Sequence, residues 1–202
     1  SCIYPKNIKK KITEDQMFKG DFEPTNEGYA VSKFISIKIC KFISEKKGYN
    51  YKTLVPTNLY GPNDTYDLKK SHLLAAIIKK LDDAKKIKNK NIEIWGDGKA
   101  KREFMYVSDL SDAIWFSVKN FSKIPSILNI GTGKDYTVEN YYRKVSKIIY
   151  PEAKFYFNKK KPSGMRRKLL DVSKSKRLGW KSKVTLTNGI NKTYKDYKKK
   201  YE

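Results

Sequence analysis

The amino-acid sequence predicts an α/β fold with a largely parallel sheet. Short apolar segments typical of strands alternate with longer amphipathic segments typical of helices, and turn residues separate them. Alternating strands and helices favour parallel pairing, because a parallel connection needs a crossover that a helix usually supplies. The 202 residues are 39% hydrophobic, which is enough to bury a sizeable core.

The first predicted elements are the end of a strand and a long helix. Ser1–Tyr4 has strand character, and the polar residues 6–25 are expected to be irregular. A helix is predicted from about Asn26 to Lys46, with Thr25 or Asn26 as its cap and Gly48 at its end. Its apolar residues cover more than one face, so this helix is expected to pack on a sheet and on a partner as well.

The same local signals predict five more strands and four more helices. The predicted strands are 51–56, 91–95, 103–107, 127–130 and 155–157. The predicted helices are 71–86, 108–119, 137–150 and 186–201, and a turn-rich loop is predicted over 57–64. Ser108 or Asp109 is expected to cap the second of these helices and Thr137 the third, since short polar side chains bind free N–H groups at helix starts.

The net charge of +24 makes nucleic acid the first partner to consider. The composition argues against it, because 40 of the basic residues are Lys and only five are Arg, whereas proteins that read bases depend on bidentate Arg. The lysines are spread along the whole chain, and the residues with A- and T-rich codons are all abundant. We interpret the charge as a composition bias and expect no nucleic-acid partner. A basic surface still attracts phosphorylated substrates.

Two other kinds of site are disfavoured. No apolar stretch approaches the roughly 18 residues that a membrane span needs, so no membrane partner is expected. Cys2 and Cys40 form neither a disulfide framework nor a metal-binding spacing, which favours a reducing, cytoplasmic location and no metal site.

Tyr29 and Lys33 form the motif that first points to catalysis. Their spacing places the phenol and the ammonium on one face of the predicted helix. A neighbouring cation favours the phenolate, so such a Tyr readily exchanges a proton with a carbonyl or alcohol oxygen. The motif alone is weak, because 15 Tyr and 40 Lys produce chance pairs. Tyr194 and Lys198 have the same spacing, and we interpret that pair as a solvated helix face.

Further segments give the chain a resemblance to a known family. The chain resembles the GDP-L-fucose synthases, which belong to the extended short-chain dehydrogenases/reductases, over essentially its whole length. The Tyr-x-x-x-Lys motif and the Arg-Glu-Phe segment are shared by the wider superfamily, whereas Ser-Cys-Ile-Tyr-Pro, Pro-Thr-Asn-Leu-Tyr-Gly-Pro-Asn-Asp and Ser-His are more specific. The segments that carry the resemblance are 1–5, 23–30, Lys33, 56–64, 71–72, 95–98, 102–104, 129–133, 167–171 and 178–180.

The resemblance implies the second half of a Rossmann-type parallel sheet together with a small α+β substrate-binding domain. Residues 1–65 correspond to the C-terminal half of an NADP-binding domain, and residues 66–202 to the substrate-binding region, with about 103–131 returning to the first domain. The family's N-terminal strand and Gly-rich loop have no counterpart, since G-x-x-G-x-x-G occurs nowhere in the sequence. We therefore expect a fragment that is inactive by itself. The helix at 26–46 resembles the family's dimer-forming helix, which implies a homodimer.

The implied reaction takes place on a GDP-sugar. The resemblance implies epimerisation of GDP-4-keto-6-deoxy-D-mannose at C3 and C5 and its reduction at C4 to GDP-L-fucose, with NADP(H) as the cofactor. The protons at C3 and C5 are acidic because the C4 ketone flanks both carbons, and the same ketone then accepts the hydride. One pocket can therefore serve both steps.

The resemblance also assigns roles to individual residues. Tyr29 is the implied proton donor to the C4 oxygen, and Lys33 is the implied partner of the nicotinamide ribose. Cys2 and His72 are the implied acid/base pair at C3 and C5, because a thiol and an imidazole both exchange protons near neutral pH. The implied cofactor-binding residues are Ser1, Tyr29, Lys33, Pro56, Thr57, Asn58, Leu59 and His72.

The implied substrate-binding residues are Lys80, Trp95, Arg102 and Ser163. The forked guanidinium of Arg102 suits a diphosphate. Lys80 stands where family members commonly carry Arg, so it keeps the charge and loses the bidentate geometry. Ser163 stands where family members often carry Asp, which weakens the expected contact with a sugar hydroxyl.

Each of these residues also has a structural alternative. His72 could be packed at a helix start or could cap the helix. Cys2 could be a buried strand cysteine, as Cys40 is expected to be. Trp95 could belong to the core, and Arg102 could be an ordinary surface Arg.

Three other functions stay open at this stage. A nucleotide-sugar 4-epimerase or dehydratase on the same scaffold lacks the Cys2 and His72 pair, so mutation of both residues would leave it active. A nucleic-acid-binding protein would lose affinity steeply with salt. A truncated gene product would have no catalysis, and the reading frame upstream of Ser1 distinguishes it from a clipped enzyme.

Overall fold

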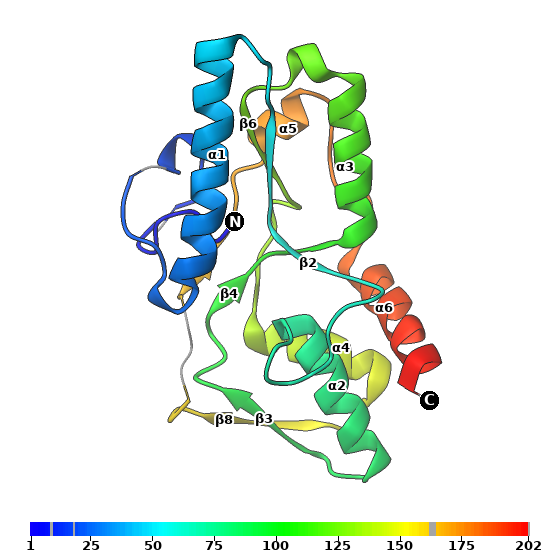
Figure 1. The fold of residues 1–202 in the computed structure, drawn as a ribbon. Coiled ribbons are helices and arrows are strands. Elements are labelled where there is room, and N and C mark those ends of the chain that lie inside the picture. Colours follow the sequence, from blue (N-terminus) through cyan, green and yellow to red (C-terminus); the bar gives the residue numbers. More distant parts are fainter. Residues whose placement is uncertain (9, 18, 162–164, 202) are drawn as a thin grey trace.

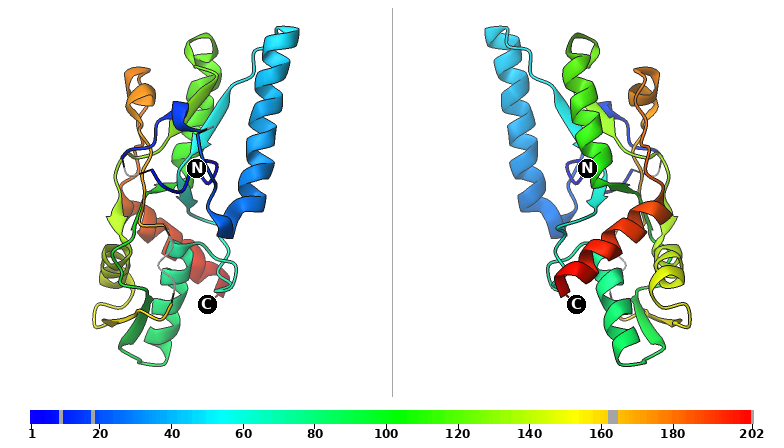
Figure 2. Two further views of the ribbon diagram at one scale, coloured as in Figure 1. Left: turned by 90° about the vertical axis from the view of Figure 1, so that its left-hand side faces the viewer. Right: turned by 90° about the vertical axis from the view of Figure 1, so that its right-hand side faces the viewer.

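The computed structural model describes residues 1–8, 10–17, 19–161 and 165–201, and its elements form two groups along the long axis of the molecule (Figure 1). The first group consists of α1 (Glu27–Lys47), β1 (Thr53–Pro56), α3 (Val107–Lys119), β6 (Ile127–Ile130) and α5 (Ser173–Arg177). The second group consists of α2 (Leu73–Lys86), β3 (Asn91–Trp95), α4 (Val138–Ile149) and β8 (Lys154–Asn158). Helix α6 (Leu186–Tyr201) crosses the junction between the groups, as both views in Figure 2 show.

The remaining elements of the described chain are short strands and single 3₁₀ turns. The strands are β2 (Asn58–Tyr60), β4 (Lys101–Arg102), β5 (Phe104–Tyr106), β7 (Tyr136–Thr137) and β9 (Arg167–Lys168). The 3₁₀ turns are η1 (Glu14–Gln16), η2 (Pro24–Asn26) and η3 (Phe121–Lys123).

The strand pairing is largely parallel, which confirms the predicted fold class. β1 pairs with β6, β2 with β5 and β3 with β8, each in parallel. Strand β4 pairs in parallel with β9 and antiparallel with β7. The β1–β6 register places Val55 opposite Asn129, so residues 127–130 lie beside residues 53–56. This pairing supports the predicted return of about residues 103–131 to the first domain, a division that stays a prediction.

Helix α1 confirms the long helix predicted around the Tyr29 motif. It ends where Gly48 adopts a left-handed φ of 72°, and the Gly48 N–H donates to the Ser44 carbonyl at 3.1 Å. Asn26 occupies the N-cap position as predicted, but its side chain makes no capping hydrogen bond, and a 3₁₀ turn over Pro24–Asn26 leads directly into the helix. Ala30 and Ile37 are its buried residues, and several large apolar side chains elsewhere on the helix are exposed.

Three predicted elements differ in the structure. Ser1–Tyr4 forms a turn instead of a strand, because its one backbone bond to a strand is the Ser1 amino group donating to the Pro56 carbonyl at 3.0 Å. The predicted loop at 57–64 contains strand β2, since its pairing with β5 is a long-range contact that local turn residues do not reveal. Helix α3 begins at Val107, one residue before the predicted start.

The expected cap of α3 was also wrong. Asp109 is buried, and its carboxylate accepts the backbone N–H groups of Lys183 and Val184, each at 3.1 Å. Its charge therefore fixes the segment before α6. By contrast, Thr137 caps α4 as predicted, because its hydroxyl accepts the Asn140 N–H at 3.1 Å.

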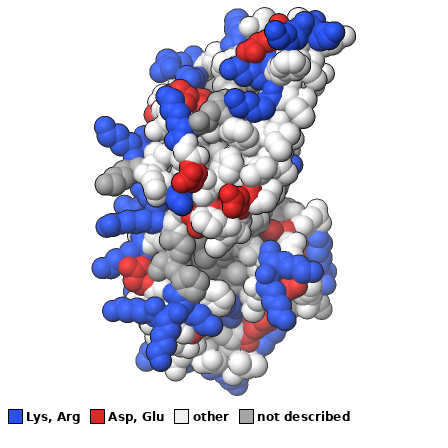
Figure 3. Space-filling model, turned by 60° about the vertical axis from the view of Figure 1, so that its left-hand side comes forward, with Lys and Arg blue, Asp and Glu red and all other residues white. Residues whose placement is uncertain are grey.

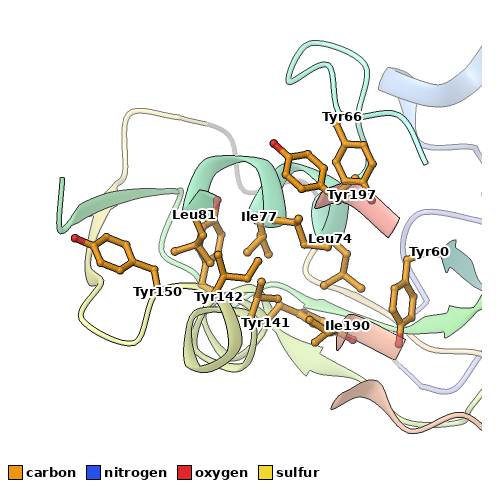
Figure 4. Packing of buried hydrophobic residues seen from close by; sticks show 14 of the residues in the cluster. Tyr60, Tyr66, Leu74, Ile77, Leu81, Tyr141, Tyr142, Tyr150, Ile190 and Tyr197 are labelled. Carbon is orange, nitrogen blue, oxygen red and sulfur yellow. The ribbon is translucent and has the colours of Figure 1, made fainter. Parts of the chain in front are cut away.

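The largest core lies in the second group of elements. Leu74, Ile77 and Leu81 of α2 point toward Tyr141 and Tyr142 of α4 (Figure 4). A second cluster holds the start of the chain against α1 and β1, and it consists of Ile3, Tyr4, Ile12, Met17, Ile37, Val55, Leu170 and Val172. Burial of Ile3 and Tyr4 in this cluster fixes the position of the neighbouring Cys2.

The basic charge does not gather over one element. On the face shown in Figure 3, Lys and Arg side chains are distributed from one end of the molecule to the other, with acidic side chains among them. Among the described residues, no helix has the length and apolar character that crossing a membrane requires.

Candidate functional site

The Tyr-x-x-x-Lys motif and the start of the chain meet at one cavity of about 450 Å³. Tyr29 and Lys33 reach it from α1, Pro56 from the end of β1, and Ser1 and Cys2 from the first turn. Five residues to which the sequence analysis assigns a site role are therefore neighbours, although they come from three separate segments.

Tyr29 and Lys33 share a helix face as their spacing predicts. The Lys33 ammonium lies 5.6 Å from the centroid of the Tyr29 ring, and 57% of the Tyr29 residue is exposed. The second pair has a similar separation of 5.8 Å, but the Tyr194 hydroxyl donates to the Asp82 carboxylate at 2.8 Å. Tyr194 is thus half-buried and committed to a structural bond, which corrects its interpretation as part of a solvated face.

Cys2 is half-buried and has a charged neighbour. The Lys168 ammonium donates to the Cys2 sulfur at 3.2 Å, across 166 positions of sequence. The Cys40 thiol was expected to be fully buried, yet it is half-buried and lines the same cavity as Cys2. Its position on α1 beside the open edge of β1 explains this exposure.

The predicted cofactor segment 56–59 divides into two parts. Pro56 lines the cavity, whereas the Thr57 hydroxyl and the Asn58 amide donate to the Glu103 carbonyl at 3.1 and 2.9 Å. Leu59 is half-buried and packs against the core beneath α3. The polar side chains of Thr57 and Asn58 therefore fix the start of β2 to Glu103, the residue before β5.

His72 is exposed at the start of α2, where it makes no side-chain capping bond. The alternative of a packed histidine is therefore wrong, and His72 occupies the N-cap position of α2 without a side-chain bond. His72 is not among the residues that line the cavity beside Cys2. Burial raises the pKa of the nearby Asp64 carboxyl, and the Thr65 N–H and the charge of His72 oppose that rise.

Lys80 and Trp95 lie together on the second group of elements. Trp95 is 48% exposed, so the alternative of a core residue is wrong. The Lys80 and Lys161 ammonium groups lie 5.2 and 5.4 Å from its ring centroid. Burial lowers the pKa of Lys80, which the charge of Glu93 opposes.

Arg102 is half-buried, so it is not an ordinary surface Arg. Its guanidinium donates to the carbonyls of Lys101 and Met165 at 2.8 and 2.5 Å, and burial lowers its pKa. A cavity of about 880 Å³ lies on the same side, lined by Lys6, Lys99, Lys101, Arg166 and Arg167 among others. Ser163 lies outside the described residues.

Glu103 is a buried residue whose role the sequence analysis missed. One carboxylate oxygen accepts the N–H groups of Thr132 and Gly133 at 2.6 and 2.7 Å, and the other accepts the Leu170 N–H at 3.0 Å. Burial raises its pKa, and these bonds oppose the rise. The Gly-Thr-Gly turn therefore binds a carboxylate of the chain itself. The only sequence signal was membership of the Arg-Glu-Phe segment.

The arrangement suits acid/base chemistry. A phenol, two thiols and three ammonium groups lie within one part of the molecule. Among the described residues, no group of three or more His, Cys, Asp or Glu side chains could hold a metal ion.

Comparisons with known proteins place this site in a family context. Residues 1–131 match the model of the NAD dependent epimerase/dehydratase family. Over 96% of its length the chain is 46% identical to the GDP-L-colitose synthase of Yersinia pseudotuberculosis. Over 98% of its length it is 42% identical to the GDP-L-fucose synthase of Azorhizobium caulinodans.

A solved structure of a GDP-sugar reductase is also similar to this chain. The GDP-mannoheptose C4 reductase MlghC from Campylobacter jejuni, solved with NADP bound, superposes with a TM-score of 0.84 at 30% identity. That match covers 98% of this chain and 67% of the reductase. The chain spans 63% of the length of each of the two curated relatives described above. Since the family model covers well over half of its residues, the chain belongs to the NAD dependent epimerase/dehydratase family.

Proposed function

We propose that this protein is an NADPH-dependent enzyme that epimerises GDP-4-keto-6-deoxy-D-mannose at C3 and C5 and reduces it at C4 to GDP-L-fucose. The observation that carries the proposal is the convergence of Cys2, Tyr29 and Lys33 on one cavity. The sister epimerase or dehydratase needs no thiol there, so the position of Cys2 favours the epimerase-reductase. The similarity to proteins named GDP-sugar synthases and GDP-sugar reductases supports the substrate class.

The cavity fits the nicotinamide-ribose end of NADPH. Its volume of about 450 Å³ lies within the usual range for small-molecule sites, and its walls supply a phenol, an ammonium and the flat face of Pro56. When bound, NADPH supplies the hydride that reduces C4. The 202 residues include no Gly-rich motif for the pyrophosphate, so we expect the chain by itself not to oxidise NADPH.

Tyr29 and Lys33 act at the reduction step. The Tyr29 hydroxyl makes no hydrogen bond to any described residue, so it is available to donate its proton to the C4 oxygen. Lys33 lies on the same helix face, where its charge stabilises the phenolate that this transfer leaves behind. The ammonium is also placed to bind a ribose hydroxyl.

Cys2 and His72 act at the epimerisation steps. One group removes the proton at C3 or C5, and the electron pair of the broken C–H bond moves onto the C4 oxygen as an enolate. The other group returns a proton to the opposite face of the carbon. His72 is exposed and Cys2 is half-buried, so both are accessible to a ligand that lies between the two groups of elements.

The GDP portion is proposed to bind over the second group of elements. Trp95 offers an exposed aromatic face, with Lys80 beside it. Arg102 and the neighbouring basic cavity supply positive charge for the diphosphate. Ser163 keeps its proposed role at the sugar. On this basis residues 1–65 bind the cofactor and residues 66–202 bind mainly the substrate.

The test of this function is loss of NADPH absorbance with GDP-4-keto-6-deoxy-D-mannose as the substrate. It uses the protein with whatever residues precede Ser1 in its gene. Tyr29→Phe is expected to slow the reduction at least about 100-fold, because it removes the general acid. Tyr194→Phe is the matched control and is expected to retain the rate. No absorbance loss with folded protein that binds NADPH would contradict the proposal.

A second product, GDP-L-colitose, is favoured by the 46% identity to a relative named for it. Colitose is a fucose analogue that lacks the C3 hydroxyl, so its 4-keto precursor has nothing to epimerise at C3. Competition between the 3-deoxy and 3-hydroxy keto sugars, followed by product mass, separates the two functions. A higher kcat/KM for the 3-deoxy substrate would make GDP-L-colitose, not GDP-L-fucose, the proposed product.

A further inference from the structure

We propose that Lys168 is a positioning residue that holds the Cys2 side chain as a base, and that Glu103 fixes the segment from which Lys168 projects. The role of Lys168 in catalysis rests on the proposed function. The contact itself does not, because it is a property of the folded chain.

The contact joins the two ends of the sequence. Lys168 ends strand β9, and its ammonium donates to the Cys2 sulfur at 3.2 Å. Both residues are half-buried, so the pair is partly screened from water while Cys2 stays open to the cavity. A neighbouring ammonium favours the thiolate, which is the basic and nucleophilic form of cysteine.

The backbone around Lys168 is held on both sides. Strand β9 pairs with β4, where Lys168 lies opposite Arg102. Just beyond it, the Ile12 N–H donates to the Leu169 carbonyl at 2.8 Å, and the Asp171 N–H donates to the Ile12 carbonyl at 2.8 Å. The backbone from which the flexible Lys168 side chain projects is therefore fixed in position.

Glu103 makes a third set of hydrogen bonds that holds the backbone near Lys168. Its carboxylate accepts the Leu170 N–H, two residues beyond Lys168, and also the N–H groups of the 132–133 turn. Its carbonyl accepts the Thr57 and Asn58 side chains. One buried residue thus joins the predicted cofactor segment 56–59 to the segment that carries Lys168.

Other charges also face this region. Tyr29 and Lys33 come from α1, and Lys52 from the segment before β1, and all three line the cavity. Ser1 lines the same cavity and lies near Lys168 and Glu103. Lys168 is the one among these groups for which a bond to the Cys2 sulfur is observed in the described part of the chain.

The experiment measures alkylation of Cys2 by iodoacetamide from about pH 6 to pH 10. All proteins carry Cys40→Ser and whatever residues precede Ser1 in the gene, and the Cys2 adduct is followed by peptide mass spectrometry. Lys168→Met is expected to slow alkylation at least fivefold near pH 7, with the rates converging near pH 10. Lys168→Arg is expected to stay within twofold of the parent, because it retains the charge.

Lys159→Met is the matched control, since Lys159 is an exposed residue of the turn after β8. Lys168→Gln is a second variant that keeps a hydrogen-bond donor, in case the Met variant does not fold. Glu103→Gln is expected to slow alkylation two- to threefold by loosening the segment.

An unchanged rate in both neutral Lys168 variants would overturn the proposal. An equal slowing at every pH would also overturn it, because that result means lost access instead of lost charge. An unchanged rate in Glu103→Gln would overturn the part assigned to Glu103.

A second measurement separates this proposal from the proposed function. Exchange of the C3 and C5 hydrogens for deuterium, measured without reduction, should fall in Cys2→Ser and in Lys168→Met. Exchange that survives Cys2→Ser would overturn the proposed function and with it the catalytic role of Lys168. The alkylation series would still report the contact.

Discussion

The pairs Tyr29–Lys33 and Tyr194–Lys198 have the same spacing but differ in what surrounds the Tyr hydroxyl. The ammonium lies beside the ring in both pairs, as expected for positions one turn apart. The difference is the partner of the hydroxyl, because Tyr194 donates to Asp82 whereas Tyr29 opens onto a cavity. The motif therefore gains its chemical meaning from what surrounds the phenol, not from its spacing.

Glu93 provides a test of local electrostatics beside Trp95. The Asn158 amide and the Trp95 indole donate to its carboxylate at 2.5 and 2.9 Å, and these bonds lower its pKa. A lowered pKa in the folded state means that this stabilisation is present at neutral pH and is lost as the pH falls through the folded value.

Asn158→Ala is therefore expected to raise the pKa of Glu93 toward its ordinary value, because it removes the hydrogen bond that lowers this pKa most. The pKa is measured by NMR titration of the side-chain carboxyl carbon. Asn91→Ala is the control. Asn91 lies at the exposed start of β3, the strand that carries Glu93, and its change should leave the Glu93 titration unchanged. An unshifted titration in Asn158→Ala would show that the bond does not persist in solution.

At the scale of elements, helix α6 joins the two groups through a close approach. A Cβ atom added at Gly189 would lie 2.0 Å from the Tyr60 hydroxyl, so the absence of a side chain lets α6 pack on β2. Gly28 on α1 has nothing within 4 Å of the same added atom. Position 189 thus has no room for a side chain, whereas position 28 has room for one.

Gly189→Ala is expected to lower the free energy of unfolding by about 2 kcal/mol, through overpacking against Tyr60. Gly28→Ala is expected to raise it by up to about 1 kcal/mol, because Ala is the better helix former. Urea denaturation of both variants measures the difference. If the Gly189 variant is as stable as the parent, α6 does not pack on β2 this closely.

At the scale of the whole molecule, α1 has an apolar face that the described residues do not cover. Its large exposed apolar side chains outside the cavity are Val31, Ile35, Ile39 and Phe42. This face is the expected contact of the homodimer that the family resemblance implies through residues 26–46. On the face shown in Figure 3, by contrast, lysines and arginines are distributed from one end of the molecule to the other.

The double change Ile39→Glu and Phe42→Glu is expected to weaken the proposed dimer at least about 100-fold. Two buried large apolar side chains together contribute about 3 kcal/mol, and the charges oppose burial. Sedimentation velocity over a range of concentrations measures the change. Trp115→Glu is the control, because Trp115 is equally exposed on α3. A dimer that persists in the double variant would exclude this helix as the interface.

The sequence by itself determined the alternation of strands and helices, the extent of α1 and the cap of α4. These features depend on residues a few positions apart, whose periodicity and capping chemistry the sequence displays directly. The resemblance added the candidate site residues, among which Cys2, Tyr29 and Lys33 meet at one cavity.

Only the tertiary structure decided the contacts between distant segments. Strand β2 exists because β5 pairs with it, and Asp109 leaves its expected cap because the segment before α6 offers N–H groups. Lys168 meets Cys2 across 166 positions, and Glu103 binds backbone N–H groups of two other segments. Such contacts arise when burial brings remote polar groups together, since a buried charge must find partners wherever the chain places them.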